Sequence, residues 1–260
     1  MKIKEVVATL ERFAPLPLQE SYDNAGLQIG LTEAESSGVL LCLDVTEDVL
    51  EEALSLGCNT VVSHHPLLFR ALRRLTDESM VERCVRMAVK NDLSVYSAHT
   101  NLDNARGGVN FQMADLLGLE DVDFLRPAEG MDGGSGIVGR LAEPMPMERF
   151  LREVQDTFGV DCLFHNRTSK SQIASVAYCG GAGAFLLGDA LRMGVDAFLT
   201  GEMGYHDYFG VEDDILIGVL GHYQSERYTM SLLRRILSEA HPTLPIYETT
   251  VNTNPIKYLY

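Results

Sequence analysis

Short apolar blocks alternate with helix-period segments along this chain, and this alternation limits its fold more than any other feature. The blocks are brief and rich in β-branched residues, whereas the segments between them place apolar residues at helical spacing. Parallel strands need crossover connections, so a βαβ rhythm of this kind is typical of a parallel sheet covered by helices. We therefore predict an α/β fold with mostly parallel sheets, whose strands fall within residues 39–45, 60–65, 93–99, 175–181, 196–202 and 214–222.

The blocks in the two halves of the chain match one another. Moving residues 39–66 by 137 positions, without a gap, aligns strand, helix and strand and places several identical residues on one another. Among them are Cys42, Ala53, Leu54 and Gly57, which fall on Cys179, Ala190, Leu191 and Gly194. A shift of 123 positions then places His99 on His222 and Asp103 on Glu226, each pair following a strand. Any two βαβ units share some likeness, but a gapless match followed by a matching polar motif favours an internal duplication.

The duplication predicts two similar βαβ-type lobes. At ~150 residues per domain, a chain of this length holds one large or two modest domains. The closest approach to a linker is the polar, glycine-rich stretch at residues 126–136, which lies near the midpoint of the 260 residues. We therefore expect a first lobe at residues 1–128 and a second at residues 129–260.

The chain is strongly acidic, with 21 Lys and Arg against 37 Asp and Glu and a net charge of −16. Such a chain is repelled by phosphate backbones and by anionic lipid. Its basic cluster is limited to Arg70, Arg73 and Arg74, which we expect on a solvated surface. The composition therefore argues against nucleic acid and membrane partners, and it leaves a small-molecule substrate as the expected partner.

The sequence also predicts a cytoplasmic protein. Its first residues place Ile3, Val6 and Leu10 on one helical face, which indicates an amphipathic helix and not a signal peptide. No apolar run approaches the ~18 residues that a membrane span requires. The five cysteines form no Cys-x-x-Cys pair, so we expect buried thiols in a reducing compartment.

His64 and His65 follow an apolar strand and precede Pro66. Neighbouring side chains on a strand point to opposite faces, so two adjacent histidines cannot easily bind one ion from regular β geometry. At the strand end, where Pro66 favours an extended His65, they can instead diverge toward two adjacent ions. The alternative is a pair of histidines that hydrogen-bonds the end of a sheet, and an isolated pair would favour it.

Other strand ends supply further metal donors. His99 and His222 each follow a strand, and Asp103 and Glu226 lie four residues later, near a helix start whose dipole favours a carboxylate. Ligands collect at the carboxyl ends of strands in this type of sheet. Three imidazoles and two carboxylates suit Zn, Fe or Mn better than Ca or Mg, so the strand ends predict a dinuclear metal site.

Five motifs resemble a known family in the family's own order. They are SYDNAGLQIG at residues 21–30, VVSHHPLLF at 61–69, AHTNLDNARGGVN at 98–110, TGEMGYHD at 200–207 and GHYQSE at 221–226. The family is the NGG-interacting-factor-three-like family, also called GTP cyclohydrolase 1 type 2 homologues. The resemblance implies two related α/β lobes, two metal ions in the cleft between them, and a toroidal homohexamer.

The resemblance also implies a set of metal ligands. Carried over residue by residue, the ligands of the family fall on His64, His65, Asp103, His222 and Glu226, and all five residue types match. In this assignment Glu226 bridges the two divalent ions.

Polar residues beside these motifs have two interpretations each. Glu202, His206 and Asp207 lie at the strand end that duplicates the His-His position, so they either line the same cleft or form a surface turn. In the cleft, His206 would act as a proton shuttle or as a substrate contact. By the resemblance, His99 is not a ligand but either a hydrogen-bonding neighbour of Asp103 or a core histidine.

Two loops have a structural interpretation. Asp23 and Asn24 are expected to close an Asx-type turn before the strand GLQIG, although they can also face the cleft. The glycines of residues 179–185 can receive a phosphate or carboxylate, but they lack the spacing of a phosphate-binding loop, so we expect a tight turn.

These features together predict a metal-dependent hydrolase. It would use a metal-bound hydroxide on a small nucleotide-like or phosphorylated substrate, with catalytic roles for Glu226 and His206. The alternative is a non-catalytic metal-binding scaffold that assembles as the hexameric ring, since two cations would also stabilise the fold. A ring that threads nucleic acid would need a basic inner surface, so the acidic composition ranks it last.

Overall fold

The computed structural model describes residues 1–259, which form two units. The first unit contains Met1–Leu102 and the C-terminal segment from Thr229, and the second unit contains Asp103–Tyr228. These boundaries differ from the expected division between residues 128 and 129. Those two residues lie in the turn of a β-hairpin inside the second unit, where the amide of Ala128 donates to the carbonyl of Gly133 at 2.8 Å. The glycine-rich stretch is therefore a hairpin turn and not a linker.

The first unit contains a five-stranded sheet in the order β1-β4-β3-β2-β11. Its strands are β1 (Gly26–Ile29), β2 (Val39–Cys42), β3 (Thr60–Ser63), β4 (Ser94–Ser97) and β11 (Ile246–Glu248). β11 comes from the C-terminal segment and runs parallel to β2, and β2, β3 and β4 are parallel to one another. β1 is the antiparallel edge strand, paired with β4. Every residue of β2, β3 and β4 is buried, as expected for strands covered on both faces.

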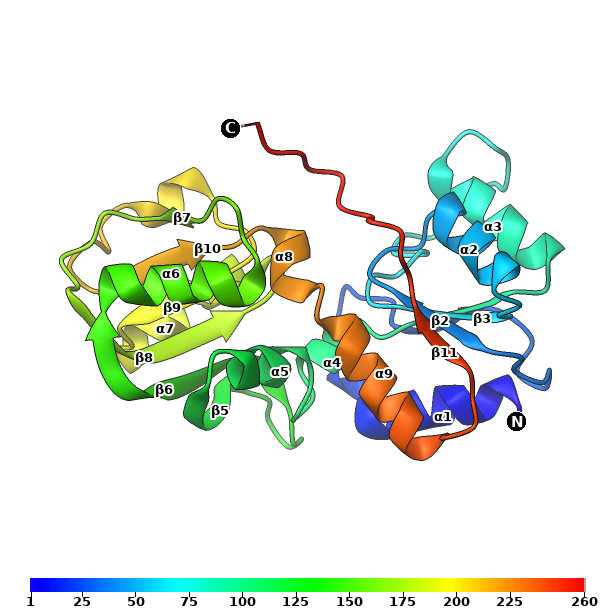
Figure 1. Ribbon diagram of the computed structural model, residues 1–260, viewed down its shortest axis with the longest axis horizontal. Helices are drawn as coiled ribbons and strands as arrows, with labels where there is room; N and C mark the ends of the chain where they lie inside the picture. Colours follow the sequence, from blue (N-terminus) through cyan, green and yellow to red (C-terminus); the bar gives the residue numbers. More distant parts are fainter. Residues whose placement is uncertain (260) are drawn as a thin grey trace. The chain divides into compact units, whose positions relative to one another are not determined.

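Helices cover both faces of this sheet. α2 (Glu47–Ser55) and α3 (Met80–Lys90) lie on one face, and α1 (Ile3–Phe13) and α9 (Thr229–Ala240) lie on the other (Figure 1). Side-chain caps fix two of the helix starts, because Thr46 accepts from the amide of Val49 at 3.3 Å and Ser79 accepts from that of Glu82 at 3.2 Å. The first unit also contains the short helix η1 (Leu16–Leu18) and the start of α4 (Thr100–Asp103), whose last residue belongs to the second unit.

The second unit contains a six-stranded sheet in the order β5-β6-β8-β9-β10-β7. Its strands are β5 (Leu119–Pro127), β6 (Gly134–Pro146), β7 (Phe164–His165), β8 (Gln172–Cys179), β9 (Ala197–Thr200) and β10 (Leu216–Val219). β8, β9 and β10 are parallel. The hairpin β5-β6, the pair β6-β8 and the edge strand β7 are antiparallel.

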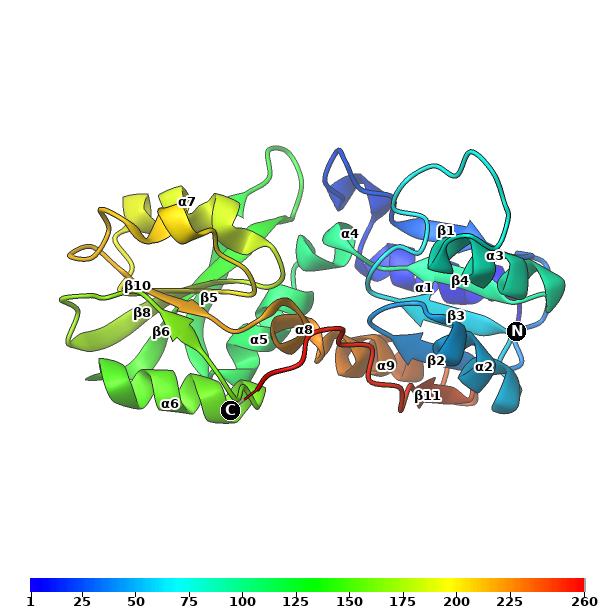
Figure 2. The same ribbon diagram turned by 90° about the horizontal axis from the view of Figure 1, so that it is seen from above.

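The helices of the second unit lie on opposite faces of its sheet. They are α5 (Val109–Leu116), α6 (Met147–Phe158), η2 (Gly183–Leu186), α7 (Leu187–Met193), η3 (Tyr205–Tyr208) and α8 (His222–Glu226). Figure 2 shows α7 on one side of the sheet and α6 on the other. Alternation along β8 accounts for both contacts, because Cys179 packs with Ala190 of α7 while Tyr178 stacks on Phe158 of α6 with ring centroids 5.8 Å apart.

The α/β prediction is confirmed, with one correction. All six predicted strands are present, as β2, β3, β4, β8, β9 and β10. The prediction of mostly parallel sheets is wrong for the second unit, because three of its strand pairs are antiparallel. The polar outer residues of β5 and β6 hid this hairpin in the sequence, since both strands carry many exposed side chains. Both sheets are therefore mixed.

The two sequence shifts that suggested a duplication align strands with strands and helices with helices in the structure. The shift of 137 places β3 on β9, and the shift of 123 places β4 on β10 and α4 on α8, each within one residue. The order β4-β3-β2 in the first unit also corresponds to the order β10-β9-β8 in the second. Common descent of the two units stays a prediction.

Several smaller expectations concern burial. Arg70, Arg73 and Arg74 are exposed, as predicted. All five cysteines are free thiols, and four of them are buried, while Cys162 is half-buried. Among residues 1–259, no helix combines the length and the apolar character needed to cross a bilayer.

Candidate metal centre

His64 and His65 lie directly after β3, at the carboxyl end of the parallel strands of the first unit. The amide of His64 donates to the carbonyl of Cys42 at 3.1 Å, and that of His65 donates to the carbonyl of Leu43 at 2.9 Å. The chain therefore stays aligned with the end of β2 as it leaves the sheet. The two imidazole rings tilt by 48° with centroids 4.9 Å apart, so they do not point to opposite faces as they would within a strand.

Each of these histidines has an acceptor at Nδ1. The carbonyl oxygen of Ala98 lies 2.8 Å from Nδ1 of His64, which is fully buried. Oδ1 of Asp44 lies 2.8 Å from Nδ1 of His65. A carbonyl or carboxylate oxygen can only accept, so Nδ1 carries a proton in both rings, and in the neutral form of each ring Nε2 carries the lone pair. This is the tautomer that a metal ligand requires.

Asp44 is held as a carboxylate. Burial alone would raise its pKa, but the hydrogen bonds from His65 and Thr253 help to outweigh burial, and the pKa lies below its usual value. Oγ1 of Thr253 donates to Oδ2 at 2.7 Å. Thr253 of the C-terminal segment therefore holds the Asp44 carboxylate in place, and that carboxylate in turn orients the ring of His65.

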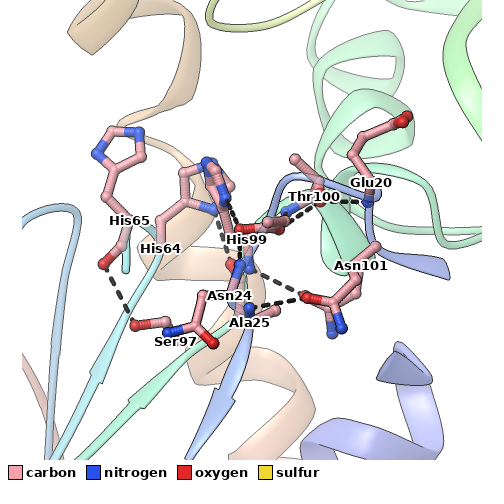
Figure 3. A network of polar contacts seen from close by, with 12 residues as sticks. Glu20, Asn24, Ala25, His64, His65, Ser97, His99, Thr100 and Asn101 are labelled. Carbon is pink, nitrogen blue, oxygen red and sulfur yellow. Dashed lines mark hydrogen bonds and ion pairs between the residues drawn. The ribbon is translucent and has the colours of Figure 1, made fainter. Parts of the chain in front are cut away.

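His99 follows β4 and joins the same end of the first sheet. Its ring centroid lies 5.4 Å from that of His64 and 5.6 Å from that of His65. One donor atom from each of the three imidazoles lies within 4.8 Å of the others. Figure 3 shows the three histidines together beside the residues of α4.

Asp23 holds His99 in place. Its Oδ1 lies 2.7 Å from Nδ1 of His99, and its Oδ2 accepts from the amide of Thr100 at 3.0 Å and from the hydroxyl of Thr100. Burial would raise the pKa of Asp23, but the hydrogen bonds from His99 and Thr100 outweigh it and lower the pKa to about 2. Asp23 also accepts from the amide of Asn24 at 2.6 Å, but the amide of Ala25, which an Asx turn at Asp23 would use, donates to Oε1 of Gln19 at 3.0 Å, so the expected Asx turn is not formed at Asp23.

His222 and Glu226 form the second unit's part of the predicted ligand set. They lie four residues apart on α8, so both face the same side of this short helix. Nε2 of His222 lies 3.1 Å from Oε2 of Glu226. Two donors on one tetrahedral zinc ion are separated by about 3.3 Å, so this pair is spaced as two ligands of one ion would be.

Glu226 is only 4 % exposed, and its carboxylate lies against the loop after β8. In that loop Gly181 has a φ of +56°, which a glycine adopts at little cost. Its amide donates to Oγ of Ser225 at 3.0 Å, and the hydroxyl of Tyr178 donates to the carbonyl of Ser225 at 2.6 Å. Burial and the neighbouring Glu226 carboxylate raise the pKa of Tyr178 well above its usual value. The expected tight turn at residues 179–185 is thus confirmed, and it anchors α8.

Glu202 approaches His222 from the end of β9. Its Oε1 lies 2.8 Å from Nδ1 of His222, which assigns Nε2 of that ring the lone pair as well. Asp207 instead accepts from the amide of Gly204 at 3.1 Å and so closes its own turn. His206 is exposed, with its ring 5.3 Å from that of Tyr205. Of these three residues, the structure connects only Glu202 directly to a predicted ligand.

Asp103 is the last residue of α4, and Asn110 fixes its backbone. The side-chain amide of Asn110 donates to the carbonyl of Asp103 at 3.1 Å, and its oxygen accepts from the amide of Gly180 at 3.1 Å. Asn110 is 2 % exposed, so this bridge is shielded from water. Through it, the position of Asp103 is tied to the loop that carries Gly181.

Sequence reasoning missed three features that support the predicted ligands. Asp44, Asn110 and the pairing of Asp23 with His99 were not predicted, and His99 was expected either as a hydrogen-bonding neighbour of Asp103 or as a core histidine. A signal existed for Asp44, because it follows β2 at the same sheet edge as the histidines. The pairing of Asp23 with His99 joins positions 76 residues apart, and no local spacing predicts it.

The donors in each unit suit the same class of ion. The first unit supplies imidazoles, and the second supplies an imidazole with carboxylates. Nitrogen and carboxylate ligands together favour Zn, Fe or Mn over Ca or Mg. The His and Glu groups described here are therefore candidate metal ligands, and their donor set fits a divalent transition-metal ion.

Known proteins resemble this chain over nearly its whole length. The family described as Duf34/NIF3 (NGG1p interacting factor 3) matches residues 1–255. A GTP cyclohydrolase 1 type 2 homolog of Lactococcus lactis is 34% identical and covers 98% of both chains. A protein of the same name from Clostridium acetobutylicum is 30% identical over 99% of both chains. The crystal structure of Staphylococcus aureus protein SA1388 superposes with a TM-score of 0.90 at 25% identity, covering 100% of this chain and 99% of that one.

Proposed function

This chain belongs to the Duf34/NIF3 family, and we propose that it is a metal-dependent hydrolase acting on a small nucleotide-like or phosphorylated substrate. In this proposal two divalent ions, Zn, Fe or Mn, are bound by the predicted ligands His64, His65, Asp103, His222 and Glu226. The relatives carry the name GTP cyclohydrolase 1 type 2 homolog, which makes GTP the first substrate to test.

One observation carries the metal-binding part of the proposal. Each histidine of the predicted ligand set has its Nδ1 within 2.8 Å of an acceptor, which is the Ala98 carbonyl for His64, Asp44 for His65 and Glu202 for His222. These acceptors fix the orientation of each ring and direct the lone pair to Nε2. Such acceptors are typical of metal-binding histidines, and they raise the basicity of the ligand.

Buried Glu226 supports the same conclusion. A carboxylate that is 4 % exposed is costly unless positive charge or hydrogen bonds compensate it. Nε2 of His222, which carries a lone pair, lies 3.1 Å from Glu226, and a divalent ion bound by both groups would supply positive charge to the carboxylate. A carboxylate has two oxygens, so Glu226 can bridge two ions, as the family resemblance implies.

The chemistry follows from the ligands and their neighbours. Divalent ions in such a site activate water and polarise the scissile bond. Glu226 and the three histidines would hold the ions, and Asp44 and Glu202 would keep the histidines oriented. His206, which is exposed beside Tyr205, is our candidate for moving a proton to or from the substrate.

The competing proposal is a metal-binding scaffold without catalysis. The same ligands would serve it, because metal bound by a folded chain stabilises that chain. In either case we propose assembly as a toroidal homohexamer, which the family resemblance implies.

A substrate screen separates the two proposals. The protein is loaded with Zn, Mn or Fe and assayed with GTP, other nucleotides and phosphate esters. We expect turnover that is lost in Asp103→Ala, while Asp115→Ala, which removes an exposed aspartate of α5, keeps it. Equal turnover in Asp103→Ala would identify a contaminating enzyme. Full metal loading with no turnover of any substrate would favour the scaffold.

A further inference from the structure

Tyr22 and Phe69 expose large aromatic rings beside the candidate metal centre. Tyr22 is 62% exposed and Phe69 is 43% exposed, and their rings meet edge to face with centroids 6.4 Å apart. Phe69 also lies perpendicular to the ring of His99, with centroids 6.1 Å apart, and the ring of His99 lies 5.6 Å from that of His65. Ring contacts therefore lead from a predicted ligand to the surface of the first unit, where two aromatic side chains are open to solvent.

Three hydrogen bonds hold the two segments that carry these rings. Nδ2 of Asn24 donates to the carbonyl of Leu68 at 2.6 Å, the amide of Leu68 donates to Oε1 of Gln28 at 2.7 Å, and Nε2 of Gln28 donates to the carbonyl of Asn24 at 2.7 Å. This closed set joins positions 40 and 44 residues apart in the sequence. The backbone near Tyr22 and Phe69 is therefore fixed before any ligand binds, and a preorganised surface binds its ligand with a smaller loss of entropy.

The core contacts of this loop do not depend on Phe69. Leu67 is 7% exposed and belongs to the hydrophobic core of the first unit, and Leu68 packs against the same core. These two residues anchor the loop that follows β3, so the fold does not require the ring of Phe69 at the next position. Exposed apolar surface that the fold does not require is a common sign of a binding site.

The chemistry of the pair favours a planar ligand. Aromatic side chains bind nucleobases by stacking, and every base offers a π-face for this contact. The two rings meet at 68° and not face to face, so they do not stack on one another. The exposed surface of Tyr22 and Phe69 is therefore available for stacking with a ligand.

The residues that follow Phe69 favour a phosphorylated ligand. Arg70, Arg73 and Arg74 belong to the same loop, all three are exposed, and within residues 1–259 none of them forms an ion pair. In a chain with a net charge of −16, neighbouring cations of this kind attract an anion. Guanidinium groups bind phosphate through charge-assisted hydrogen bonds. Aromatic rings followed by arginines therefore match a nucleotide better than they match an uncharged ring or a phosphate alone.

We propose that Tyr22 and Phe69 form a platform on which the base of a nucleotide stacks, while Arg70, Arg73 and Arg74 attract its phosphates. The inference rests on the proposed function in placing the substrate beside the candidate metal centre. It deepens that function by assigning recognition of the base to two side chains that are not metal ligands. Simple phosphate esters are then poor substrates, because they have no ring to stack.

Equilibrium binding to the full, Zn²⁺-loaded chain tests this inference without requiring turnover. Isothermal titration compares GTP and ATP with inorganic triphosphate, which carries the phosphates but no base. We expect the wild type to bind both nucleotides more tightly than triphosphate. Tyr22→Ala and Phe69→Ala should each weaken nucleotide binding about 5- to 150-fold, the usual effect of losing one stacked ring, and should leave triphosphate binding unchanged.

The matched control is Tyr247→Ala in the same unit. Tyr247 is 39% exposed on the edge strand β11, so its loss removes a comparable ring from another region. We expect its nucleotide affinity to equal that of the wild type. Wild-type affinity in both Tyr22→Ala and Phe69→Ala would overturn the inference. An equal loss of nucleotide and triphosphate binding would overturn it too, as would a wild type that binds nucleotides no more tightly than triphosphate, because the rings would then not contact a base.

A conservative variant covers the case in which the alanine variants fail to fold. The chain contains no Trp, so Phe69→Trp places a single indole in the platform. Stacking on a base quenches indole fluorescence, so GTP should quench this variant and triphosphate should not. Unchanged fluorescence with GTP would contradict the stacking. Base-dependent binding without turnover would contradict the proposed hydrolase alone, whereas GTP turnover with unchanged nucleotide affinity in the alanine variants would contradict only this inference.

Discussion

The backbone of Gly181 lies directly against the carboxylate of Glu226. A Cβ atom at position 181 would overlap Oε1 of Glu226 and lie 3.3 Å from Cε1 of His222. Gly181 also has a φ of +56°, in the left-handed region. Two independent constraints therefore require glycine at this position, and only the steric one involves the predicted ligands.

Gly181→Ala should therefore displace Glu226 and weaken metal binding. Gly194→Ala is the matched control, because Gly194 has a φ of +68° and nothing lies within 4 Å of its Cβ position. Both substitutions carry the same backbone penalty, about 1 kcal/mol. We expect both variants to lose similar stability to backbone strain in urea denaturation, with the overlap adding to the loss in Gly181→Ala. Only Gly181→Ala should lose metal, by at least 10-fold in affinity. Equal metal affinity in the two variants would show that the loop does not position Glu226.

Glu202 offers a test of how His222 is oriented. Its carboxylate accepts from Nδ1 of His222 at 2.8 Å, although its side chain is 58% exposed. Replacing Glu202 with Gln keeps an oxygen that can accept but removes the charge, so we expect metal affinity to fall about 10-fold. Isothermal titration with Zn²⁺ measures the effect, with Glu153→Gln on the exposed face of α6 as the control. An affinity equal to that of the control would mean that Glu202 has no part in metal binding.

The sequence predicted those strands that are buried on both faces, because burial makes every residue of such a strand apolar or small. β2, β3, β4, β9 and β10 have this pattern, with every residue buried, and β3 and β10 are followed by the predicted ligands His64, His65 and His222. The rule that ligands collect at the carboxyl ends of parallel strands then placed His64 and His65 correctly at one edge of the sheet. Local pattern and one general rule were sufficient for this part of the fold.

The features of the fold and the site that were not predicted depend on contacts between residues far apart in the sequence. β11 enters the first sheet from residues 246–248, and the unit boundary at Thr229 follows from that return of the chain. A three-residue strand has no recognisable periodicity, so the sequence could not reveal that the C-terminal segment returns to the first unit. The position of Asp44 after β2 was a signal in the sequence, but its pairing was not, since its partners His65 and Thr253 lie 21 and 209 residues away.

Thr253 leads to a prediction about the C-terminal segment. Its hydroxyl donates to Asp44 at 2.7 Å, whereas the hydroxyl of Thr250 donates to Glu52 at 2.7 Å in the same segment. Thr253→Val and Thr250→Val each remove one hydrogen bond to a carboxylate, at a cost of about 1 to 3 kcal/mol. We expect both to lower stability in urea denaturation, but only Thr253→Val to weaken Zn²⁺ binding, by a few-fold, because Asp44 orients His65. A similar loss of affinity in both variants would indicate a general effect of loosening the segment.

Asp196 gives a prediction for the pH dependence of stability. Burial would raise its pKa, but hydrogen bonds from Ala174 and Ser175 outweigh burial and hold the pKa below its usual value. Its Oδ2 accepts from the amides of both residues at 3.0 Å and from the hydroxyl of Ser175 at 2.9 Å. A lowered pKa in the folded state means that the unfolded chain binds the proton first as the pH falls. The stabilisation is therefore complete above the unfolded pKa of about 4 and is lost as the pH falls through the folded pKa.

Asp196→Asn removes the charge that these donors stabilise. We expect it to lower the free energy of unfolding by about 1 to 3 kcal/mol at neutral pH, because two amides and a hydroxyl lose a charged acceptor. The difference from the wild type should shrink as the pH falls below about 4, since the wild-type carboxylate then becomes protonated as well. Urea denaturation across this pH range measures both quantities, with Asp156→Asn on the exposed face of α6 as the control. A difference that stays constant as the pH falls would show that the ionised carboxylate of Asp196 is not the source of the stabilisation.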